Sequence, residues 1–207
     1  MEDVLIVYCR PRDLKMPLVC LDEATKQFLK ETRVPLPMKP GQPARYDYEY
    51  ERNGTANIFM IFAPLEGWRH AQVTERHTAI DYAQVLKDLA DIHFPQAPKI
   101  VLVNDNLNTH KPASLYEAFP AAEARRLVER FEWHYRPKPG SWLDMAETEL
   151  SVLSSQCLDR RIPDMQTLID EITAWETDRN KHHATVDWQF TTDDARIKLK
   201  HLYPTIW

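Results

Sequence analysis

Residues 99–110, KIVLVNDNLNTH, are the most informative segment of the sequence. Four apolar residues, three of them β-branched, follow Lys99, and Asn104, Asp105 and Asn106 come directly after them. A short apolar run that turn-forming residues close is typical of a strand buried on both faces. Asp105 would then stand at the end of a rigid strand, where chemistry usually sits, although an aspartate in this place can equally just open a turn.

A second run of the same kind, Met16–Glu23, reads MPLVCLDE and places Asp22 directly after its apolar residues. A right-handed crossover from Val73 through a helix to Ile100 would make the strand before Asp105 parallel to a neighbour. If that neighbour is the strand before Asp22, the two acids reach the same end of the sheet. We therefore expect both carboxylates at one edge of the core.

The composition indicates one globular domain. The chain has 207 residues, of which 43% are hydrophobic and 28% charged. No apolar run approaches the length of a membrane span, and the N-terminus lacks the basic region of a signal peptide. The net charge of −5 argues against a domain that grips nucleic acid by bulk charge, but leaves local basic patches and bound metal ions possible. A reducing cytoplasm suits the three scattered cysteines, Cys9, Cys20 and Cys157.

The remaining elements predict an α/β fold with a mixed sheet. Four prolines within 33–45 predict an irregular connection, alternating aromatic and acidic residues over 46–50 a half-exposed strand, and Arg52-Asn53-Gly54-Thr55 a turn. Residues 46–75 are thus expected to form an antiparallel meander. In order, the other expected elements are strands at 57–63, 68–73, 100–103 and 131–135, helices at 78–93, 113–119, 121–130, 144–161 and 164–182, and a short helix from 193.

A third carboxylate of interest comes from the helix after the loop 136–140. Glu147 lies in its first turn, but Asp144 and Glu147 also have the spacing of a capping box, in which the glutamate only reaches back to the cap. Glu149 is a rival, because both glutamates flank the apolar stripe and periodicity does not choose between them. Carboxylates drawn together repel unless cations lie between them, and hard oxygen ligands suit Mg²⁺ or Mn²⁺.

Four other side chains are candidates for contact with a phosphate or a base. His110 closely follows Asp105, although a histidine there more often makes only local hydrogen bonds. Arg136 and Lys138 stand beside the expected site, so phosphate contact and plain solvation are equally good readings. Trp142 either anchors its loop or stacks on a base.

Several motifs resemble the transposases of the insertion sequence 630 family, the bacterial branch of the mariner-like superfamily. They are Val19-Cys20-Leu21-Asp22-Glu23, Lys39-Pro40-Gly41-Gln42-Pro43, Asp105-Asn106-Leu107-Asn108-Thr109-His110 and Pro139-Gly140-Ser141-Trp142-Leu143-Asp144-Met145-Ala146-Glu147. The resemblance extends through Asp187–Thr192 to Tyr203-Pro204. It implies a ribonuclease-H-like fold, with a mixed five-stranded sheet flanked by helices. It also implies a DDE catalytic domain over 17–185, a lead-in or linker over 1–16 and a C-terminal tail over 186–207.

The resemblance also implies an activity. Asp22, Asp105 and Glu147 match the catalytic acid triad and would bind two Mg²⁺ ions, which Mn²⁺ can replace. The enzyme would cleave the phosphodiester at a transposon end, and the freed 3′-hydroxyl would attack target DNA, typically at a TA dinucleotide. The partners expected from the resemblance are transposon-end and target DNA, with His110, Arg136, Lys138 and Trp142 as contacts, and a second copy of the chain in an active homodimer.

Two departures from the family leave alternatives open. Asp144 stands where the family usually has asparagine, so it either perturbs metal binding or simply caps the helix. Nothing ahead of Asp22 is long enough for the helix-turn-helix modules that read transposon ends, so that region is expected to be missing or on another polypeptide. The alternatives are a truncated or domesticated, non-catalytic remnant that acts as an interaction module, and a different nuclease of the same fold.

Overall fold

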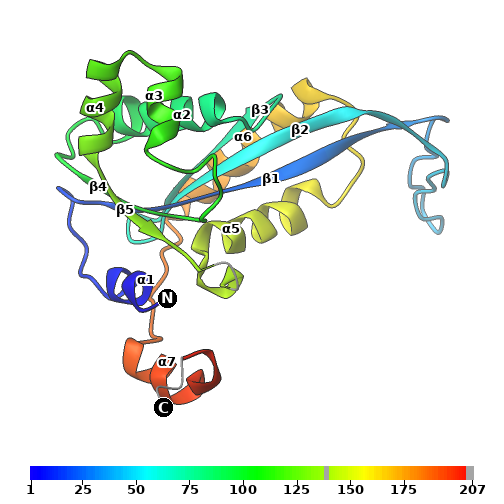
Figure 1. The fold of residues 1–207 in the computed structure, drawn as a ribbon. Coiled ribbons are helices and arrows are strands. Elements are labelled where there is room, and N and C mark those ends of the chain that lie inside the picture. The colour runs from blue at the N-terminus through cyan, green and yellow to red at the C-terminus, as the bar shows by residue number, and fades with distance from the viewer. Residues whose placement is uncertain (138–139, 204–207) are drawn as a thin grey trace.

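A computed structural model describes residues 1–137 and 140–203 and shows one five-stranded sheet (Figure 1). The strand order is β3-β2-β1-β4-β5. The first three strands pair antiparallel, and β4 and β5 run parallel to β1, so the predicted mixed sheet is confirmed. The strands are β1 (Leu18–Glu31), β2 (Tyr50–Ala63), β3 (Trp68–Thr74), β4 (Ile100–Asn104) and β5 (Phe131–Tyr135).

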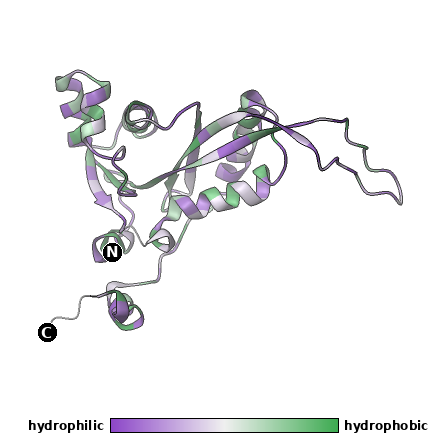
Figure 2. Ribbon diagram, turned by 45° about the vertical axis from the view of Figure 1, so that its right-hand side comes forward, coloured by the Kyte–Doolittle hydropathy of each residue, from purple (hydrophilic) through white to green (hydrophobic). Residues whose placement is uncertain are grey.

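Helices cover both faces of the sheet, and each face has its own hydrophobic core. One core contains residues of α2, α3 and α4, and the other contains residues of α1, α5, α6 and α7. Figure 2 shows alternating apolar and polar segments along α4 and α5, as expected for helices with one buried side. The helices are α1 (Glu2–Tyr8), α2 (Ala79–Asp88), α3 (Ala113–Ala118), α4 (Ala121–Arg130), α5 (Met145–Leu153), α6 (Met165–Lys181) and α7 (Thr192–Lys198).

The helix predictions hold with small changes at the ends. Thr78 caps α2 as expected, and a π-helical turn over Leu89–His93 extends it. Another π-helical turn extends α5 as far as Leu158, short of the predicted end at residue 161. Within the described residues, no helix combines the length and the apolar character that crossing a bilayer requires.

The alternation of side chains along the two central strands sets the direction of the acids. In β1, Cys20 faces the core of α5 and α6, whereas Leu21 faces the core of α2. In β4, Val103 faces the same side as Cys20. Because successive side chains of a strand point to opposite faces, the next residues on the α5 side are Asp22 and Asp105.

The register of the parallel pair brings these acids level. Leu21 of β1 is paired with Asn104 of β4, so Asp22 and Asp105 follow residues that lie side by side. Parallel strands also end at the same edge of a sheet. The expectation that the Asp22 and Asp105 strands are neighbours is therefore confirmed.

One part of the predicted meander is wrong. Residues 46–49 lie outside any strand, and β2 runs without a reversal through Arg52–Thr55, where a turn was predicted. Gly54 has a φ of 97°, and three steps along β2 from Arg52 to Thr55 match two steps along β1, from Leu29 to Gln27. Glycine tolerates such a φ, so this segment forms a β-bulge within the strand.

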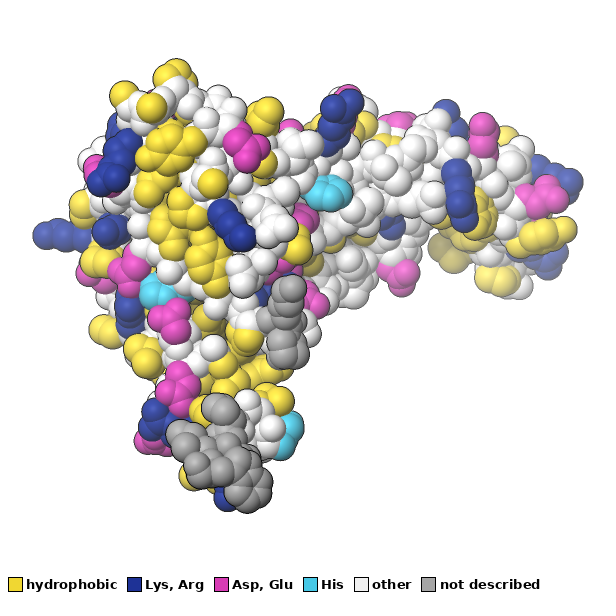
Figure 3. All heavy atoms as spheres, in the orientation of Figure 1, with side chains coloured by type: hydrophobic (Ala, Val, Ile, Leu, Met, Phe, Trp, Pro, Cys, Tyr) yellow, Lys and Arg dark blue, Asp and Glu magenta, His cyan; other side chains and the backbone are white. Residues whose placement is uncertain are grey.

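The outer halves of β1 and β2 form an arm that projects from the body of the molecule (Figure 1). The segment 32–49 at its end is irregular, as its prolines predict, with only two isolated bridges, Leu36 to Arg45 and Lys39 to Gln42. Figure 3 shows basic and hydrophobic side chains together near the tip of the arm. The exposed hydrophobic residues of this segment are Val34, Leu36, Met38, Tyr46 and Tyr48.

The two ends of the described chain pack against each other and against the sheet. Residues 1–16, expected as a lead-in or linker, contain the helix α1, whose Val4 and Leu5 are fully buried. The apolar run that starts at Val4 supplies the buried side of this helix. Ala195 of α7 is also fully buried, and Arg196 pairs with Glu2 at 2.8 Å, so α7 lies beside α1 (Figure 1).

Candidate active site

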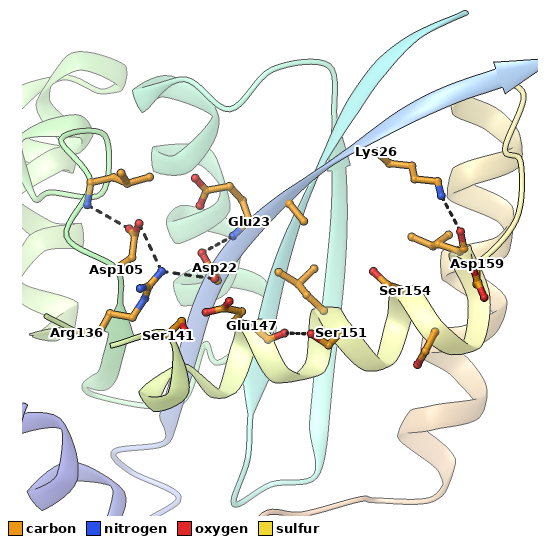
Figure 4. Close-up of a pocket in the computed structure, with 15 residues that line it drawn as sticks. Asp22, Glu23, Lys26, Asp105, Arg136, Ser141, Glu147, Ser151, Ser154 and Asp159 are labelled. Atoms are coloured by element: carbon orange, nitrogen blue, oxygen red, sulfur yellow. Dashed lines mark hydrogen bonds and ion pairs between the residues drawn. The ribbon is translucent and has the colours of Figure 1, made fainter. Parts of the chain in front are cut away.

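The three predicted acids line one open pocket of about 860 Å³ between β1, the end of β4 and α5 (Figure 4). Asp22 and Asp105 come from neighbouring parallel strands, and Glu147 comes from the first turn of α5. The sequence separates these residues widely, and the fold brings them together. Arg136, which directly follows β5, lines the same pocket.

Asp22 lies at the bottom of the pocket and is only 7% exposed. Burial, together with the nearby charge of Asp144, raises the pKa of Asp22 to about 7. Carboxylate oxygens of Asp22, Asp144 and Glu147 lie within 4.8 Å of one another. Burial also raises the pKa of Asp144. These three side chains form a cluster of carboxylates whose mutual repulsion a bound cation would relieve.

Asp105 has a different environment, which holds it in the charged form. Its Oδ1 accepts a hydrogen bond from the backbone N–H of Leu107 at 3.2 Å and lies against Nδ1 of His110. Burial by itself would favour the neutral acid, but the hydrogen bond and charge of His110 outweigh it and lower the pKa of Asp105. The pKa values of Asp22, within β1, and Asp105, just after β4, are thus shifted in opposite directions.

Arg136 lies between the acids and links them. Its Nη2 is 3.9 Å from Oδ2 of Asp22 and 4.0 Å from Oδ2 of Asp105, while its Nε is 2.7 Å from Oδ2 of Asp144. Its backbone N–H donates to the carbonyl of Asn104, which fixes its position beside β4. A positive charge in this place offsets the repulsion between the carboxylates.

Asp144 caps the helix that carries Glu147. Its Oδ1 accepts hydrogen bonds from the backbone N–H groups of Ala146 and Glu147, at 3.0 and 3.1 Å. The side chain of Glu147 does not complete a capping box with it, but faces the pocket (Figure 4). Its Oε2 is buried and has no hydrogen-bond partner within the described residues. The aspartate that departs from the family pattern thus caps α5 and pairs with Arg136, and its carboxylate also lies in the close group with Asp22 and Glu147.

Glu149, the rival of Glu147, belongs to a different cluster. Its Oε1 lies 2.9 Å from Nε of Arg69, whose side chain is completely buried, and 2.8 Å from Nε of Arg179 on α6. Arg69 also donates to backbone carbonyls at Gly67, Arg179 and Ala184. The carboxylate of Glu149 thus joins β3 to α6 and is turned away from the pocket.

The structure places His110 and Trp142, two of the other predicted contacts with DNA, in different environments. The ring of His110 is 1% exposed and lies behind Asp105, so it is not placed to touch bound DNA, because its nitrogens already face carboxylates. Trp142 is 43% exposed and meets Phe190 edge to face at 5.5 Å, so it anchors its loop to the C-terminal tail. Lys138 lies outside the described residues.

A row of polar side chains on α5 and on the π-helical turn after it was not among the predicted site residues. Glu147, Ser151, Ser154 and Ser155 all line the pocket, which continues towards Lys26 on β1 (Figure 4). Spacings of three, four and seven residues put these side chains on one side of a helix. A polar stripe with helical spacing was therefore the available signal. Glu23, which also lines the pocket, was missed as well, although it directly follows Asp22.

The side chains of the pocket fit a divalent cation. Carboxylate oxygens are the ligands that hard cations such as Mg²⁺ and Mn²⁺ prefer. The carboxylates grouped within 4.8 Å of one another are those of Asp22, Asp144 and Glu147, a group that does not include Asp105. Oε2 of Glu147 is a buried acceptor that a cation would satisfy. Burial, and after it the charge of Asp144, raises the pKa of Asp22 although Arg136 lies nearby, and a cation bound here would favour the charged carboxylate.

Solved structures of one transposase have a similar fold. The chain aligns with the Mos1 strand transfer complex at a TM-score of 0.60 and 15% identity, over 87% of this chain and 53% of that one. With the Mos1 mariner paired end complex with Mn the TM-score is 0.57 and the identity 16%, over 87% of this chain and 54% of that one. With a pre-cleavage Mos1 transpososome the TM-score is 0.56 and the identity 14%, over 90% of this chain and 62% of that one. The chain thus spans 53 to 62% of the length of these proteins.

The mixed five-stranded sheet with flanking helices is therefore the ribonuclease-H-like fold. No curated protein sequence matches the chain. A family model does match, over residues 17–169, and its description is DDE superfamily endonuclease. This range contains Asp22, Asp105 and Glu147, and the family's fold implies the use of a divalent metal. The chain belongs to the DDE superfamily of endonucleases.

Proposed function

We propose that this chain is the catalytic domain of a DNA transposase of the mariner-like superfamily. It cleaves a phosphodiester at the end of an insertion sequence and joins the freed 3′-hydroxyl to target DNA. The observation that carries this proposal is the convergence of Asp22, Asp105 and Glu147 on one open pocket. The family match and the fold of the Mos1 complexes support it.

Asp22, Asp105 and Glu147 would together hold two Mg²⁺ ions, which Mn²⁺ can replace. When bound, such ions activate a water molecule and stabilise charge on the attacking and leaving oxygens of a phosphodiester. The protein contributes the placement of the ligands. Two rigid strands and a capped helix hold the acids, so little ordering remains to be done when the cations bind.

Arg136 is proposed to balance the charge of the acids and to contact a phosphate of the DNA. Without cations it balances the charge of the acids, and its anchor is Asp144. When cations neutralise the acids, its guanidinium is available for a phosphate oxygen, for which its planar fork is well suited. Lys138 and Trp142 are proposed as further contacts of the same DNA strand.

The working assembly is proposed as a homodimer on transposon-end and target DNA. The similar structures are described as paired end, strand transfer and pre-cleavage complexes of Mos1. Because the chain spans little more than half of those proteins, recognition of the transposon ends is assigned to a further segment or to a second polypeptide.

The first prediction tests the central assignment. Asp105→Asn removes the charge of one proposed metal ligand but keeps the size of the side chain. We therefore expect the rate of cleavage of a DNA duplex that carries the transposon end to fall by about 1,000-fold or more. The assay is run with Mg²⁺, with Mn²⁺ and with EDTA. The control is Asp187→Asn, an identical change at an exposed position in the tail.

Unchanged cleavage by Asp105→Asn would reject the assignment. A chain that folds but neither cleaves DNA nor binds Mg²⁺ or Mn²⁺ by calorimetry would instead be a non-catalytic interaction module. Preference for a hybrid or branched substrate over the terminal repeat would point to another nuclease of the same fold.

A further inference from the structure

His110 is a buried histidine with a carboxylate at each of its ring nitrogens. Nδ1 lies against Oδ1 of Asp105, and Nε2 lies 3.1 Å from Oε2 of Glu23. Only 1% of the residue is exposed, so water does not compete for either nitrogen. Nδ1 forms a hydrogen bond with Asp105, whereas Nε2 and Glu23 are close in distance only, because Oε2 of Glu23 has no hydrogen-bond partner among the described residues. His110 thus lies between the two acids in one row.

The two carboxylate oxygens of Asp105 have different surroundings in this row. Oδ1 faces His110 and also accepts the backbone N–H of Leu107, whereas Oδ2 faces the pocket, 4.0 Å from Arg136. One oxygen is therefore held by the protein and the other is free for a ligand. A carboxylate fixed in this way cannot rotate about its terminal torsion without losing two hydrogen bonds.

The ring of His110 is itself held from the other sides. It stacks on the ring of Tyr82 in α2, with the centroids 4.5 Å apart. The side-chain amide of Asn104 donates to the backbone carbonyls of Asp105 and His110, at 2.9 and 3.2 Å. The loop between the acid and the histidine is thereby closed on itself, so the row does not depend on flexible groups.

We propose that His110, whose ring is held by Tyr82 and lies beside Glu23, is a positioning residue. Its Nδ1 turns Asp105 so that Oδ2 alone is presented to a divalent cation. The inference rests on the proposed function in one respect, that Asp105 is a cation ligand. It assigns to His110 a role that neither the family match nor the fold provides. Partners of this kind around metal ligands typically change metal affinity by about 10- to 100-fold when removed.

Two substitutions of similar size separate the two nitrogens. The amide nitrogen of asparagine takes the place of Nδ1, and that of glutamine takes the place of Nε2. We expect His110→Asn to bind Mn²⁺ within about threefold of the unmodified chain in calorimetry, because the donor to Asp105 remains. We expect His110→Gln to bind about 10-fold more weakly or worse. Tyr82→Phe, which keeps the stacked ring, is the control and should bind normally.

Equal affinities of the two His110 variants, whether both normal or both reduced, would overturn the proposal, since a purely structural role does not distinguish the nitrogens. Asp105→Asn serves as the reference for losing the ligand itself. Weak binding by this variant together with normal binding by His110→Gln rejects the positioning role alone. Equal binding by Asp105→Asn and the unmodified chain rejects the proposed function, and the positioning role with it.

Discussion

Glu147 and Glu149 stand two residues apart on α5 and have different partners. Glu149 pairs with Arg69 and Arg179, and so fixes α6 to the sheet. Glu147 faces the pocket with a buried oxygen that finds no hydrogen bond in the described part of the chain. Both are glutamates beside one apolar stripe, so their roles come from the neighbours that the fold supplies.

The charged form of Asp22 is unfavourable in the folded chain. Its pKa is raised to about 7 because the carboxyl is buried and because Asp144 lies nearby. The unfolded chain releases this proton near the ordinary pKa of 3.8, and the folded chain only near 7. The folded chain therefore binds more protons between these values, and its stability falls as the pH rises through this interval.

The second prediction concerns this penalty. The Asn side chain of Asp22→Asn cannot ionise, so the variant avoids the cost of a buried charge. In EDTA, the difference in free energy of unfolding between the variant and the unmodified chain should therefore be about 3 kcal/mol larger, in favour of the variant, at about pH 8 than at about pH 4.5. Urea unfolding at the two pH values measures the difference. Asp187→Asn should show no such growth, because that side chain is exposed. A gain for Asp22→Asn that does not depend on pH would contradict the burial argument.

Among the elements, α5 depends on its N-cap, the residue directly before it. Asp144 is 2% exposed and satisfies two backbone N–H groups of the helix with Oδ1, while Oδ2 pairs with Arg136. The N-terminus of α5 and the end of β5 are therefore tied by one side chain. The orientation of Glu147 follows from this cap, because its own N–H is one of the two that are satisfied.

The third prediction tests the cap. Asp144→Ala should lower the free energy of unfolding by about 2 kcal/mol, since both N–H groups lose their acceptor. Asp144→Asn keeps an oxygen for them and should cost less than half as much, because asparagine caps helices as well as aspartate. Urea unfolding at neutral pH compares the two. Equal losses would show that the pair with Arg136, and not the cap, determines the stability.

The β1–β2 arm shows a second effect at this scale. Turn-forming residues within β2 do not reverse the chain, because eleven paired positions with β1 hold the strand on both sides of Gly54. The local preference of Asn53-Gly54 is satisfied by a bulge instead. Long-range pairing thus prevails over a two-residue turn signal.

In the molecule as a whole, the two ends of the described chain support the site from behind. The ring of Trp188 meets Tyr8 of α1 at 4.9 Å, and the hydroxyl of Tyr8 donates to the carbonyl of Leu143 at 2.6 Å, just before the cap of α5. A continuous set of contacts therefore runs from the C-terminal segment through α1 to the helix that carries Glu147.

The fourth prediction follows from these contacts. Trp188→Ala should lower the free energy of unfolding by about 2 kcal/mol, a value below that for a fully buried aromatic residue because Trp188 is half-buried. Gln189→Ala, at the exposed neighbouring position, should leave stability unchanged. Thermal and urea unfolding measure both variants. A loss near zero for Trp188→Ala would mean that the tail contributes nothing to the body of the domain.

Much of the site was accessible from local sequence patterns. Short apolar runs ended by Asp22 and Asp105 predict two strands, and the crossover rule makes them parallel. For His110 the sequence left open contact with a ligand or only local hydrogen bonds, and the structure shows the local bond to Asp105, with Glu23 from a distant part of the chain beside the other ring nitrogen. The predicted turn at Arg52–Thr55 failed because strand pairing decides between a turn and a bulge.

Periodicity and the parallel crossover are local or nearly local properties, so they were sufficient to predict most helices, the apolar parts of the strands and the edge of the sheet where the first two acids meet. They did not predict α1, the continuation of β1 to Glu31 or the bulge in β2. Only the tertiary structure decided which glutamate faces the pocket, that Arg136 lies among the acids and that His110 holds Asp105 from behind. Each of these outcomes depends on pairing with a charge far away in the sequence, and no periodic pattern records such a partner.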